Sequence, residues 1–460
     1  MSRPPSRAGH AGAGGSRPAP GAGRPAPRDG GQRARALEIL LAVEGGRFAS
    51  ELLAPGDGRF VRELVLGVLR RTLTLDSVIG SFGARERRDL DPDVRGALRL
   101  GLYQVLFMDG VPPHAAVSES VATLPARSRG YANAVLRAVL RESHKVPEGE
   151  DRGGASPTKR LHRPGRAVIF FSRAVFPDPT RDRTGWLAAV HSHPRLLVER
   201  WVARLGEDAA VARMEAGNQP APLVLRPRHG RITAAELVDL LALQRIAADV
   251  LPRPDSPGAD AVLVRAGQDD VFACSAFRDG LFVAQDLSQM DAAEILEPRA
   301  GEVVWDLCAA PGGKASQLAE RLGGEGGGRV VATDSSEERL LRLQQTVARL
   351  RLGNVECAVH DALSGAPPAG RPPHGFDAVL VDAPCSNTAV LARRPEARWR
   401  LRPDTFTELA ALQRRLLGAA RAHLRPGGRL VYSVCSFEPE EGEAHGLRPT
   451  RSPFVWTEGA

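Results

Sequence analysis

The chain has 460 residues, of which 43% are hydrophobic, and it carries a formal net charge of +8. This length suggests about two to four domains, with enough apolar side chains to give each a core. No run of about 18 apolar residues is present, so we expect no membrane span, and the N-terminus lacks the apolar region of a signal peptide.

The cysteines and the charge narrow the class further. The five cysteines are odd in number and none has the spacing of a CxxC pair. This pattern disfavours a disulfide framework and a cysteine-rich zinc site, so we expect no metal and a reducing compartment. The positive charge is compatible with a nucleic-acid partner, although an arginine-rich composition with solvated arginines explains it equally well. We therefore expect a cytoplasmic protein, and a monomer.

The N-terminal third divides into a tail and a helical region. Residues 1–33 are rich in Gly, Pro, Ala and Arg, and their few large apolar side chains cannot offset the entropy of ordering, so we predict a disordered basic tail. Residues 34–142 place apolar side chains at helical spacing, as in Leu37, Leu40 and Leu41, with prolines between the segments. This pattern predicts an all-α bundle.

The middle of the chain is less regular. Residues 143–183 are rich in charge, Gly and Pro, which predicts a linker, although the apolar patch Ala167 to Phe171 has no place in it. Residues 184–284 begin with helical patterns and continue with short β-like runs around a helical stretch. We predict helices followed by a small α+β subdomain.

Residues 285–460 alternate between strand and helix patterns. Strands are expected at Val303 to Leu307, Arg329 to Thr333, Val355 to Val359, Ala378 to Val381 and Arg429 to Ser433. Repeated βα units predict an α/β Rossmann-like domain whose parallel sheet binds ligands at the carboxyl ends of its strands.

The turn after the first of these strands has the composition of a ligand-binding loop. Small residues let the backbone approach a ligand, and the next helix begins with free N–H groups. The candidate cofactor-binding residues of this turn are Cys308, Ala309, Ala310, Pro311, Gly312, Gly313 and Lys314. The turn is neither a P-loop, since Cys308 and Ala315 replace the required Gly and Ser/Thr, nor a GxGxxG dinucleotide loop.

Acidic residues end the following strands as well. Asp334 can accept hydrogen bonds from the ribose hydroxyls of a nucleoside, and Asp361 can accept one from an adenine amino group. Asp382 ends the fourth strand. For any one of these residues, capping the next helix is the better interpretation. For the whole set we favour a nucleoside ligand at the edge of the sheet.

Two cysteines follow adjacent strands at the same edge. Cys385 lies in Asp-Ala-Pro-Cys-Ser and Cys435 in Tyr-Ser-Val-Cys-Ser. A thiolate that adds to carbon 6 of cytosine turns carbon 5 into a nucleophile for an electrophilic methyl group, and cysteine suits this role. Asp382 can hydrogen-bond the ring at N3, and the second cysteine can assist elimination. An isolated cysteine is more often simply buried, as we expect for Cys274 and Cys357.

These motifs resemble one known family. DLCAAPGGK (306–314), DAPCS (382–386), RRPEARW (393–399) and SVCSFEPEEGE (433–443) are similar to the RsmB/Sun-type RNA (cytosine-5) methyltransferases, and YANAVLRAVLR (131–141) is similar to their NusB-like RNA-binding domain. The resemblance implies S-adenosyl-L-methionine as cofactor and a cytosine of small-subunit ribosomal RNA as substrate. It also implies Cys435 as nucleophile and Cys385 as an aid to product release, whereas DNA cytosine methyltransferases use the Pro-Cys cysteine as nucleophile.

The chain departs from that family at two places. Asn387, Thr388 and Ala389 stand where the family has a small residue, Thr and Gly, and residues 445–460 show no pattern for the helix and two strands expected after the last motif. We therefore expect an incomplete or truncated C-terminal sheet edge. These departures favour an alternative, an RNA-binding protein with an inactive methyltransferase core. A methyltransferase acting on an amine is a third hypothesis.

Overall fold

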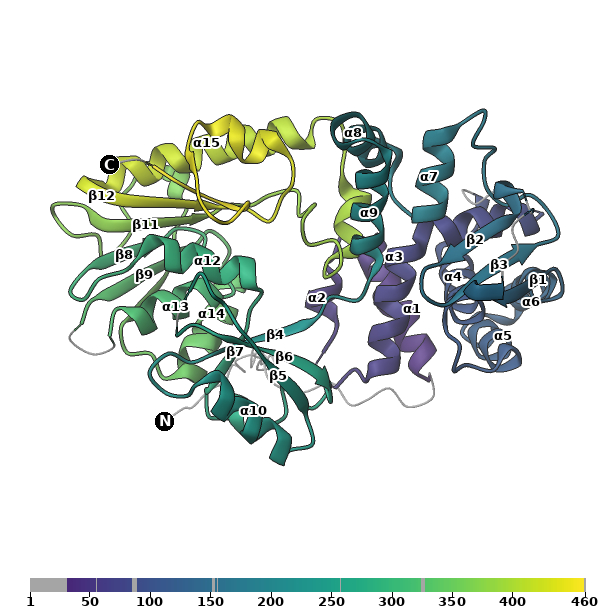
Figure 1. Cartoon of the computed structure of the whole chain (residues 1–460), viewed down its shortest axis with the longest axis horizontal. Helices are drawn as coiled ribbons and strands as arrows, with labels where there is room; N and C mark the ends of the chain where they lie inside the picture. Colours follow the sequence, from purple (N-terminus) through teal and green to yellow (C-terminus); the bar gives the residue numbers. More distant parts are fainter. Residues whose placement is uncertain are drawn as a thin grey trace, which may run out of the picture.

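The protein was analysed as a computed structural model, which describes residues 31–54, 56–84, 89–150, 154, 156–256, 258–323 and 327–458. It is elongated, with a helical domain at one end and two sheet-containing domains at the other (Figure 1). The predicted basic tail at 1–33 lies mostly outside the described residues, and its last two residues already belong to the first helix. No helix in the described part of the chain is long and apolar enough to cross a bilayer.

The N-terminal domain is a helical bundle, as its sequence pattern predicts. Its elements are α1 (Gln32–Glu44), α2 (Ala49–Leu52), α3 (Arg59–Phe82), α4 (Pro92–Phe107), α5 (Pro113–Ala122) and α6 (Ala126–Arg141). Helix α4 is central, because it packs against α1, α3, α5 and α6 and buries Leu98, Leu100 and Leu102 completely. Gly67 permits the closest approach between α3 and α4, since a Cβ there would lie 2.0 Å from the Tyr103 ring.

The segment 143–183 is not the predicted linker. It forms an antiparallel sheet in the order β1-β3-β2 from β1 (Ser143–Pro147), β2 (Arg160–Arg163) and β3 (Ala167–Phe171), with 3₁₀ turns at Glu148–Glu150 and Pro157–Lys159. The unplaced apolar patch is strand β3, whose Ile169 and Phe171 join the core of the helical bundle. The Gly- and Pro-rich turns between short strands obscured this sheet in the sequence.

The next region holds three helices and a small α+β domain. The elements are α7 (Arg183–His191), α8 (Arg195–Leu205), α9 (Glu207–Asn218), β4 (Leu223–Pro227), α10 (Ala234–Leu243), β5 (Ala247–Leu251), β6 (Ala261–Ala266), α11 (Ser275–Arg278) and β7 (Phe282–Ala284). The strands form an antiparallel sheet in the order β5-β6-β4-β7, with the core of this domain between the sheet and α10.

The C-terminal domain has the predicted α/β architecture. Its elements are α12 (Leu287–Leu296), β8 (Val303–Asp306), α13 (Gly313–Arg321), β9 (Arg329–Asp334), α14 (Glu337–Leu350), β10 (Val355–Val359), β11 (Phe376–Asp382), α15 (Thr405–His423), β12 (Leu424–Ser433), β13 (Arg448–Pro449) and β14 (Val455–Thr457), with 3₁₀ turns at Ala362–Ser364, Pro395–Arg400, Pro439–Glu441 and Glu443–His445. The sheet order is β10-β9-β8-β11-β12-β14-β13, and its first five strands are parallel. The chain reverses its direction of travel across the sheet between β8 and β11, where open α/β sheets bind ligands.

The expectation that residues 445–460 add no strand is wrong. Strand β14 pairs antiparallel with β12, and β13 pairs with β14. Val455 and Trp456 are buried in the two cores on either face of the sheet. Both strands are too short to show alternation in the sequence, and 3₁₀ turns stand where a further helix was expected.

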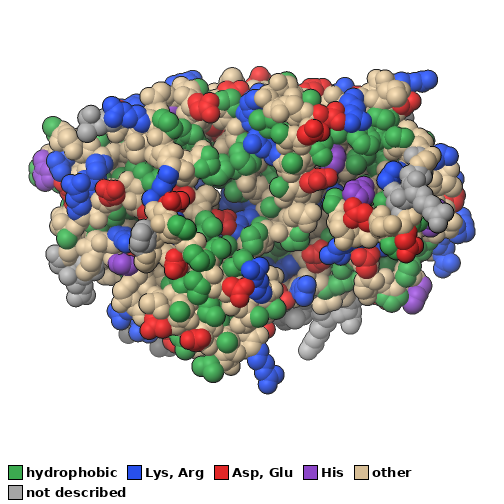
Figure 2. All heavy atoms as spheres, viewed as in Figure 1, with side chains coloured by type: hydrophobic (Ala, Val, Ile, Leu, Met, Phe, Trp, Pro, Cys, Tyr) green, Lys and Arg blue, Asp and Glu red, His purple; other side chains and the backbone are tan. Residues whose placement is uncertain are grey.

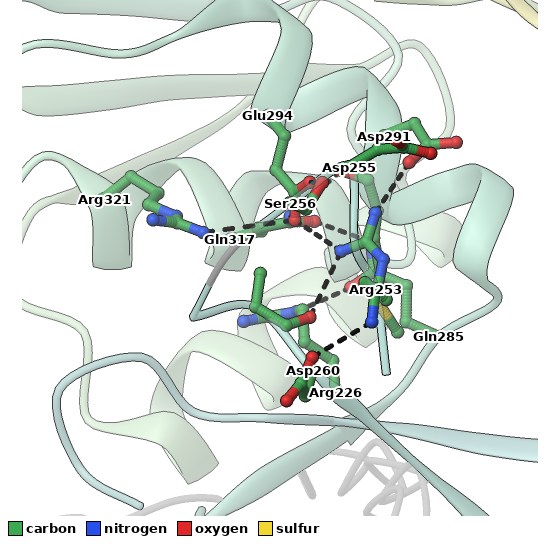
Figure 3. A network of polar contacts seen from close by, with 12 residues as sticks. Arg226, Arg253, Asp255, Ser256, Asp260, Gln285, Asp291, Glu294, Gln317 and Arg321 are labelled. Carbon is green, nitrogen blue, oxygen red and sulfur yellow. Dashed lines mark hydrogen bonds and ion pairs between the residues drawn. The ribbon is translucent and has the colours of Figure 1, made fainter. Parts of the chain in front are cut away.

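Charged side chains fix the small α+β domain to the C-terminal domain (Figure 3). Arg253 donates to Asp291 and Glu294 of α12, both at 2.6 Å. Arg226 of β4 pairs with Glu320 of α13 and donates to Gln285 at 2.8 Å. These partners come from two domains and most are buried, so the network holds the two sheets in one arrangement.

The segment 392–400 joins the C-terminal domain to the helices of the N-terminal half. Arg398 is fully buried and donates to Ser192 O (2.9 Å), Asn218 Oδ1 (2.7 Å) and Gly217 O (2.9 Å). Trp399 Nε1 donates to Leu69 O of α3 at 3.1 Å. The chain therefore packs residues of its last third against its first helices.

We expect Arg398→Met to lower the free energy of unfolding by about 3 kcal/mol or more, because three buried acceptors lose their donor. Scanning calorimetry measures this as a lower Tm. The matched control is Arg402→Met, since Arg402 pairs with Glu408 at the surface, where a pair contributes about 0–1 kcal/mol. Equal Tm values for the two variants would contradict a structural role for Arg398.

Candidate active site

Carboxylates from three neighbouring strands gather at the carboxyl edge of the parallel sheet. Asp306 ends β8, Asp334 ends β9 and Asp382 ends β11. Asp382 is held from two sides, because Lys314 Nζ donates to its Oδ2 and Ser433 Oγ donates to its Oδ1, both at 2.7 Å. Lys314 is buried in the first turn of α13, so its ammonium group is directed to this carboxylate rather than to solvent.

The loop from 307 to 312 connects β8 to α13 and is closely packed. Ala309 N donates to Thr333 O at 2.8 Å, and Gly312 N donates to Ala309 O at 2.8 Å. Gly312 has φ +105°, which favours glycine, and a Cβ there would lie 3.4 Å from Leu343 of α14. The small residues predicted for ligand binding, Cys308 to Gly313, therefore form a tight turn that leads into the free N–H groups of α13.

The other acidic residues differ in their environments. Asp334 Oδ1 accepts from Ser336 N and pairs with Arg339, both at 2.9 Å, whereas its buried Oδ2 has no hydrogen-bond partner among the described residues. Asp361 is exposed and caps the 3₁₀ turn that follows β10, accepting from Leu363 N at 2.9 Å. Asp334 thus retains a free acceptor inside the site, while Asp361 has the capping contact that the alternative interpretation expects.

Asp306 ends the first of the four strands that the sequence predicts to end in an acid, but it was not assigned a contact of its own. It is fully buried, and neither carboxylate oxygen has a hydrogen-bond partner within the described ranges. Burial, and then the charge of Asp382, raise the pKa of Asp306 to about 8. The side chain is therefore mostly protonated at neutral pH.

Cys385 and Cys435 lie in contact. Strands β11 and β12 pair Asp382 with Ser433, so the loops that follow them run side by side and place the two sulfur atoms 2.9 Å apart. The Cys385 thiol donates to Cys435, which lowers the pKa of Cys435 below its usual range and raises that of Cys385 well above it. The pair is therefore polarised, with Cys435 as the more acidic of the two thiols.

The residues that depart from the family pattern form part of this arrangement. Asn387 has φ +62°, which Asn tolerates better than most residues, and its Nδ2 donates to Cys385 O at 2.8 Å. Its Oδ1 accepts from the Cys435 thiol at 3.4 Å and from Arg394 Nη1 at 3.2 Å. Thr388 Oγ1 accepts from Phe437 N at 2.9 Å. The departures add contacts to the thiol loops and do not separate them.

A buried carboxylate links the loop that carries Cys385 to the loop that carries Cys435. Glu441 is fully buried and accepts from Ser386 N at 2.9 Å and from Ser436 Oγ at 2.6 Å. The sequence offered no reason to select it, since it follows the motif cysteine by six residues in an acidic run. Its two contacts fix the residue after each cysteine.

The remaining cysteines lie apart from this pair. Burial raises the pKa of Cys308 far above its usual range and that of Cys357 to about 11, so neither thiol ionises at neutral pH. Within the described residues, no group of three or more His, Cys, Asp or Glu side chains could hold a metal ion. The residues predicted for the site, Asp361 included, follow parallel strands and lie at the carboxyl edge of the sheet.

The sheet and its site define the class of the protein. In order along the C-terminal domain, the strands are arranged 3-2-1-4-5-7-6 with the seventh antiparallel, and a small-residue turn after the first strand faces an acidic residue after the second. This is a Rossmann-like methyltransferase domain, which confirms the predicted fold class together with the N-terminal bundle and the small sheet domain.

The chain belongs to the RsmB/F family of 16S rRNA methyltransferases. The family model for 16S rRNA methyltransferase RsmB/F matches residues 293–446, that for the NusB family matches 31–141, and that for the ferredoxin-like domain of RsmF/B-like methyltransferases matches 193–264. The family suggested by the sequence motifs is therefore confirmed.

Individual relatives span most of the chain. Ribosomal RNA small subunit methyltransferase B of Vibrio cholerae is 34% identical over 400 residues, covering 85% of this chain and 81% of the relative. A probable ribosomal RNA small subunit methyltransferase B of Synechocystis is 31% identical, covering 88% and 85%. The crystal structure of PH0851 is similar in fold, with a TM-score of 0.69 at 24% identity and 92% of each chain covered.

Proposed function

We propose that this protein methylates carbon 5 of a cytosine in small-subunit ribosomal RNA, with S-adenosyl-L-methionine as methyl donor. The observation that carries the proposal is the polarised pair Cys385–Cys435, set beside the Lys314–Asp382 ion pair at the ligand edge of a methyltransferase sheet. A methyltransferase that acts on oxygen or nitrogen needs no thiolate there. The names of the relatives are the basis for proposing small-subunit ribosomal RNA as the substrate.

The residues at the edge fit the cofactor. The buried, unpartnered Asp334 Oδ2 is an acceptor that a ribose hydroxyl would satisfy. The close turn up to Gly312 and the N–H groups of α13 would hold the amino-acid part, with Lys314 and Asp382 beside it. Asp361 is the least supported contact, because it already caps a turn. When bound, S-adenosyl-L-methionine supplies an electrophilic methyl group.

The chain's own residues then have distinct roles. The Cys435 thiolate forms a bond to carbon 6 of the cytosine, which makes carbon 5 the nucleophile that takes the methyl group. Asp382 accepts a hydrogen bond from ring nitrogen N3, which takes up a proton from water as the thiolate adds, and Lys314 offsets the negative charge at this site. A water molecule takes the carbon-5 proton, the electrons of that C–H bond restore the ring double bond as the bond between carbon 6 and sulfur breaks, and Cys385 assists by hydrogen-bonding the sulfur that leaves.

The surroundings are consistent with an RNA substrate. The molecule is hollowed between the helical domain and the two sheet domains, and Lys and Arg side chains lie in this hollow (Figure 2). Such a surface attracts a phosphate backbone. We further infer that the protein acts in the cytoplasm, where thiols such as its five free cysteines stay reduced, and that it acts as a monomer.

The proposal is tested with labelled S-adenosyl-L-methionine and unmethylated small-subunit ribosomal RNA. Digestion of the RNA to nucleosides should place the label in 5-methylcytidine, and large-subunit RNA should remain unlabelled. Label in any other nucleoside would overturn the cytosine assignment. Cofactor binding without transfer to either RNA would favour an RNA-binding protein with an inactive core.

We expect Asp334→Ala to weaken S-adenosyl-L-methionine binding about 10- to 100-fold, since hydrogen bonds to a charged acceptor contribute roughly 1.5–3 kcal/mol. Isothermal titration calorimetry measures the Kd. The control is Arg339→Met, which removes the ion pair to Asp334 but leaves the free acceptor. An equal loss of affinity in both variants would show that the ion pair, and not a cofactor contact, accounts for the effect.

The thiol pair predicts a pH dependence. Because the Cys385 hydrogen bond lowers the pKa of Cys435, the wild-type rate of single-turnover methyl transfer should reach half its maximum below about pH 9, the ordinary pKa of a thiol. In Cys385→Ala the pKa of Cys435 rises, so the rate should increase with pH over a higher range. Superimposable pH profiles would exclude this polarisation, and Cys357→Ala serves as the control.

A further inference from the structure

A cavity of about 350 Å³ lies on the N-terminal side of the molecule, away from the carboxyl edge of the methyltransferase sheet. Its lining includes Arg71 of α3, Arg160 and His162 of β2, Trp186 and His191 of α7, and Glu215 of α9. The walls from β2 and α7 belong to residues 142–192, which fall between the NusB and ferredoxin-like family matches. The cavity is therefore built partly from a region that the family models do not describe.

Arg71 is a cation without a counter-ion. Its guanidinium group makes no hydrogen bond and no ion pair with any described residue, and its recorded contact is with the Phe107 ring, 5.0 Å from the centroid. The nearest carboxylate in the cavity, that of Glu215, lies beside His191 at 3.9 Å instead. Burial lowers the pKa of Arg71 to about 10, so it remains charged at neutral pH. Arg71 is half-buried and lines the cavity, so an anion that enters the cavity can pair with it.

Aromatic and neutral polar groups share the cavity with this cation. Trp186 is half-buried and held in place, because its Nε1 donates to Pro157 O at 3.3 Å and the Arg183 guanidinium lies 4.7 Å from its ring. Burial lowers the pKa of His191 to about 4, which keeps the imidazole neutral and able to hydrogen-bond at pH 7. A cation for phosphate, an aromatic surface for a base and a neutral imidazole are the groups with which proteins bind unpaired nucleotides.

We propose that this cavity binds one nucleotide of single-stranded RNA, with its phosphate at Arg71 and its base against Trp186. The volume lies within the range of about 300–1,000 Å³ found for small-ligand pockets. The proposal rests on the proposed function only for the identity of the RNA. It gives strand β2 a role, since its Arg160 and His162 line this site on the helical bundle.

The test uses the full-length protein and uridine 5′-monophosphate, followed by the fluorescence of its tryptophans. The nucleotide should quench wild-type fluorescence, and quenching should be lost in Trp186→Phe. Arg71→Met should bind about 10- to 100-fold more weakly, with a Tm equal to or above wild type, because a cation without a partner has been removed. Arg402→Met is the control for loss of an arginine. Unchanged affinity in Arg71→Met, or weaker binding together with a lowered Tm, would overturn the site.

Two further binding measurements test the nucleoside and the phosphate of the ligand separately. Uridine alone and inorganic phosphate alone should each bind more weakly than the nucleotide, and equal binding by either one would overturn the proposed division between Arg71 and Trp186. In the methylation assay Arg71→Met should raise KM for the RNA and leave kcat unchanged. Nucleotide binding by a wild type that transfers no methyl group would retire the proposed function while keeping this site, and the reverse result would do the opposite.

Discussion

Cys435→Ala should reduce methyl transfer to RNA by about 10⁴-fold or more, because removal of a covalent nucleophile leaves only binding and positioning. The loop itself should persist, since Ser436 still donates to the buried Glu441 and Ala389 N still donates to the backbone carbonyl at 435. S-adenosyl-L-methionine affinity should therefore be retained. The measurement is single-turnover transfer of labelled methyl groups with protein in excess over RNA.

The comparison set for this result is Cys357→Ala, which removes a thiol from β10, and Cys435→Ser, which keeps the shape but not the acidity of the thiol. Cys357→Ala should match wild type, and Cys435→Ser should be as inactive as Cys435→Ala. Substantial activity in Cys435→Ser would exclude thiolate addition. It would instead favour transfer to an amine, a reaction that needs no covalent bond to the base.

Cys385→Ala should accumulate a covalent protein–RNA adduct. Addition and methyl transfer use Cys435, which is still present, whereas elimination loses the donor that lies 2.9 Å from the leaving sulfur. The adduct should appear as a slow band on a denaturing gel, carry the labelled methyl group and disappear on protease treatment. Turnover should fall to about one methyl group per protein.

The double variant Cys385→Ala/Cys435→Ala identifies the bonded sulfur. It should form no adduct, because the nucleophile is absent. An adduct in Cys435→Ala and none in Cys385→Ala would reverse the two roles and assign attack to the Pro-Cys cysteine, as in the DNA cytosine methyltransferases. The polarisation of the pair, with Cys385 as donor, argues for the roles stated here.

The sequence predicted the architecture well where the patterns were long. The helical bundle and the βα units were readable because their apolar periodicity extends over many residues, and Cys385 and Cys435 were readable because each follows a buried strand. Strands β13 and β14 were missed because two or three residues cannot show alternation. The sheet at 143–171 was missed because its burial depends on the helical bundle beneath it, which no local pattern records.

The contacts around the thiols were beyond sequence reasoning for a different reason. Asn387 looked like a defect because only its departure from a family pattern was visible, whereas its hydrogen bonds depend on the approach of the β12 loop. The hydrogen bonds of Glu441 to both loops and the raised pKa of Asp306 depend on burial, and the packing of the whole sheet determines which side chains are buried. Asp361, selected for its position after a strand, also accepts a hydrogen bond from the backbone of its own turn, which only the structure shows.

The segment 392–400 also bears on how the chain is made. The carbonyl of Leu69 accepts from Trp399, 330 residues later, and the amide of Ala49 donates to Glu396, 347 residues later. At about 5–20 residues per second on the ribosome, roughly 15–70 s pass between synthesis of the two halves of each contact. During that interval the helical bundle can fold, but the surface that segment 392–400 later covers stays exposed to solvent. The order of synthesis thus leaves the nascent chain most exposed to misassembly just before its catalytic domain is complete.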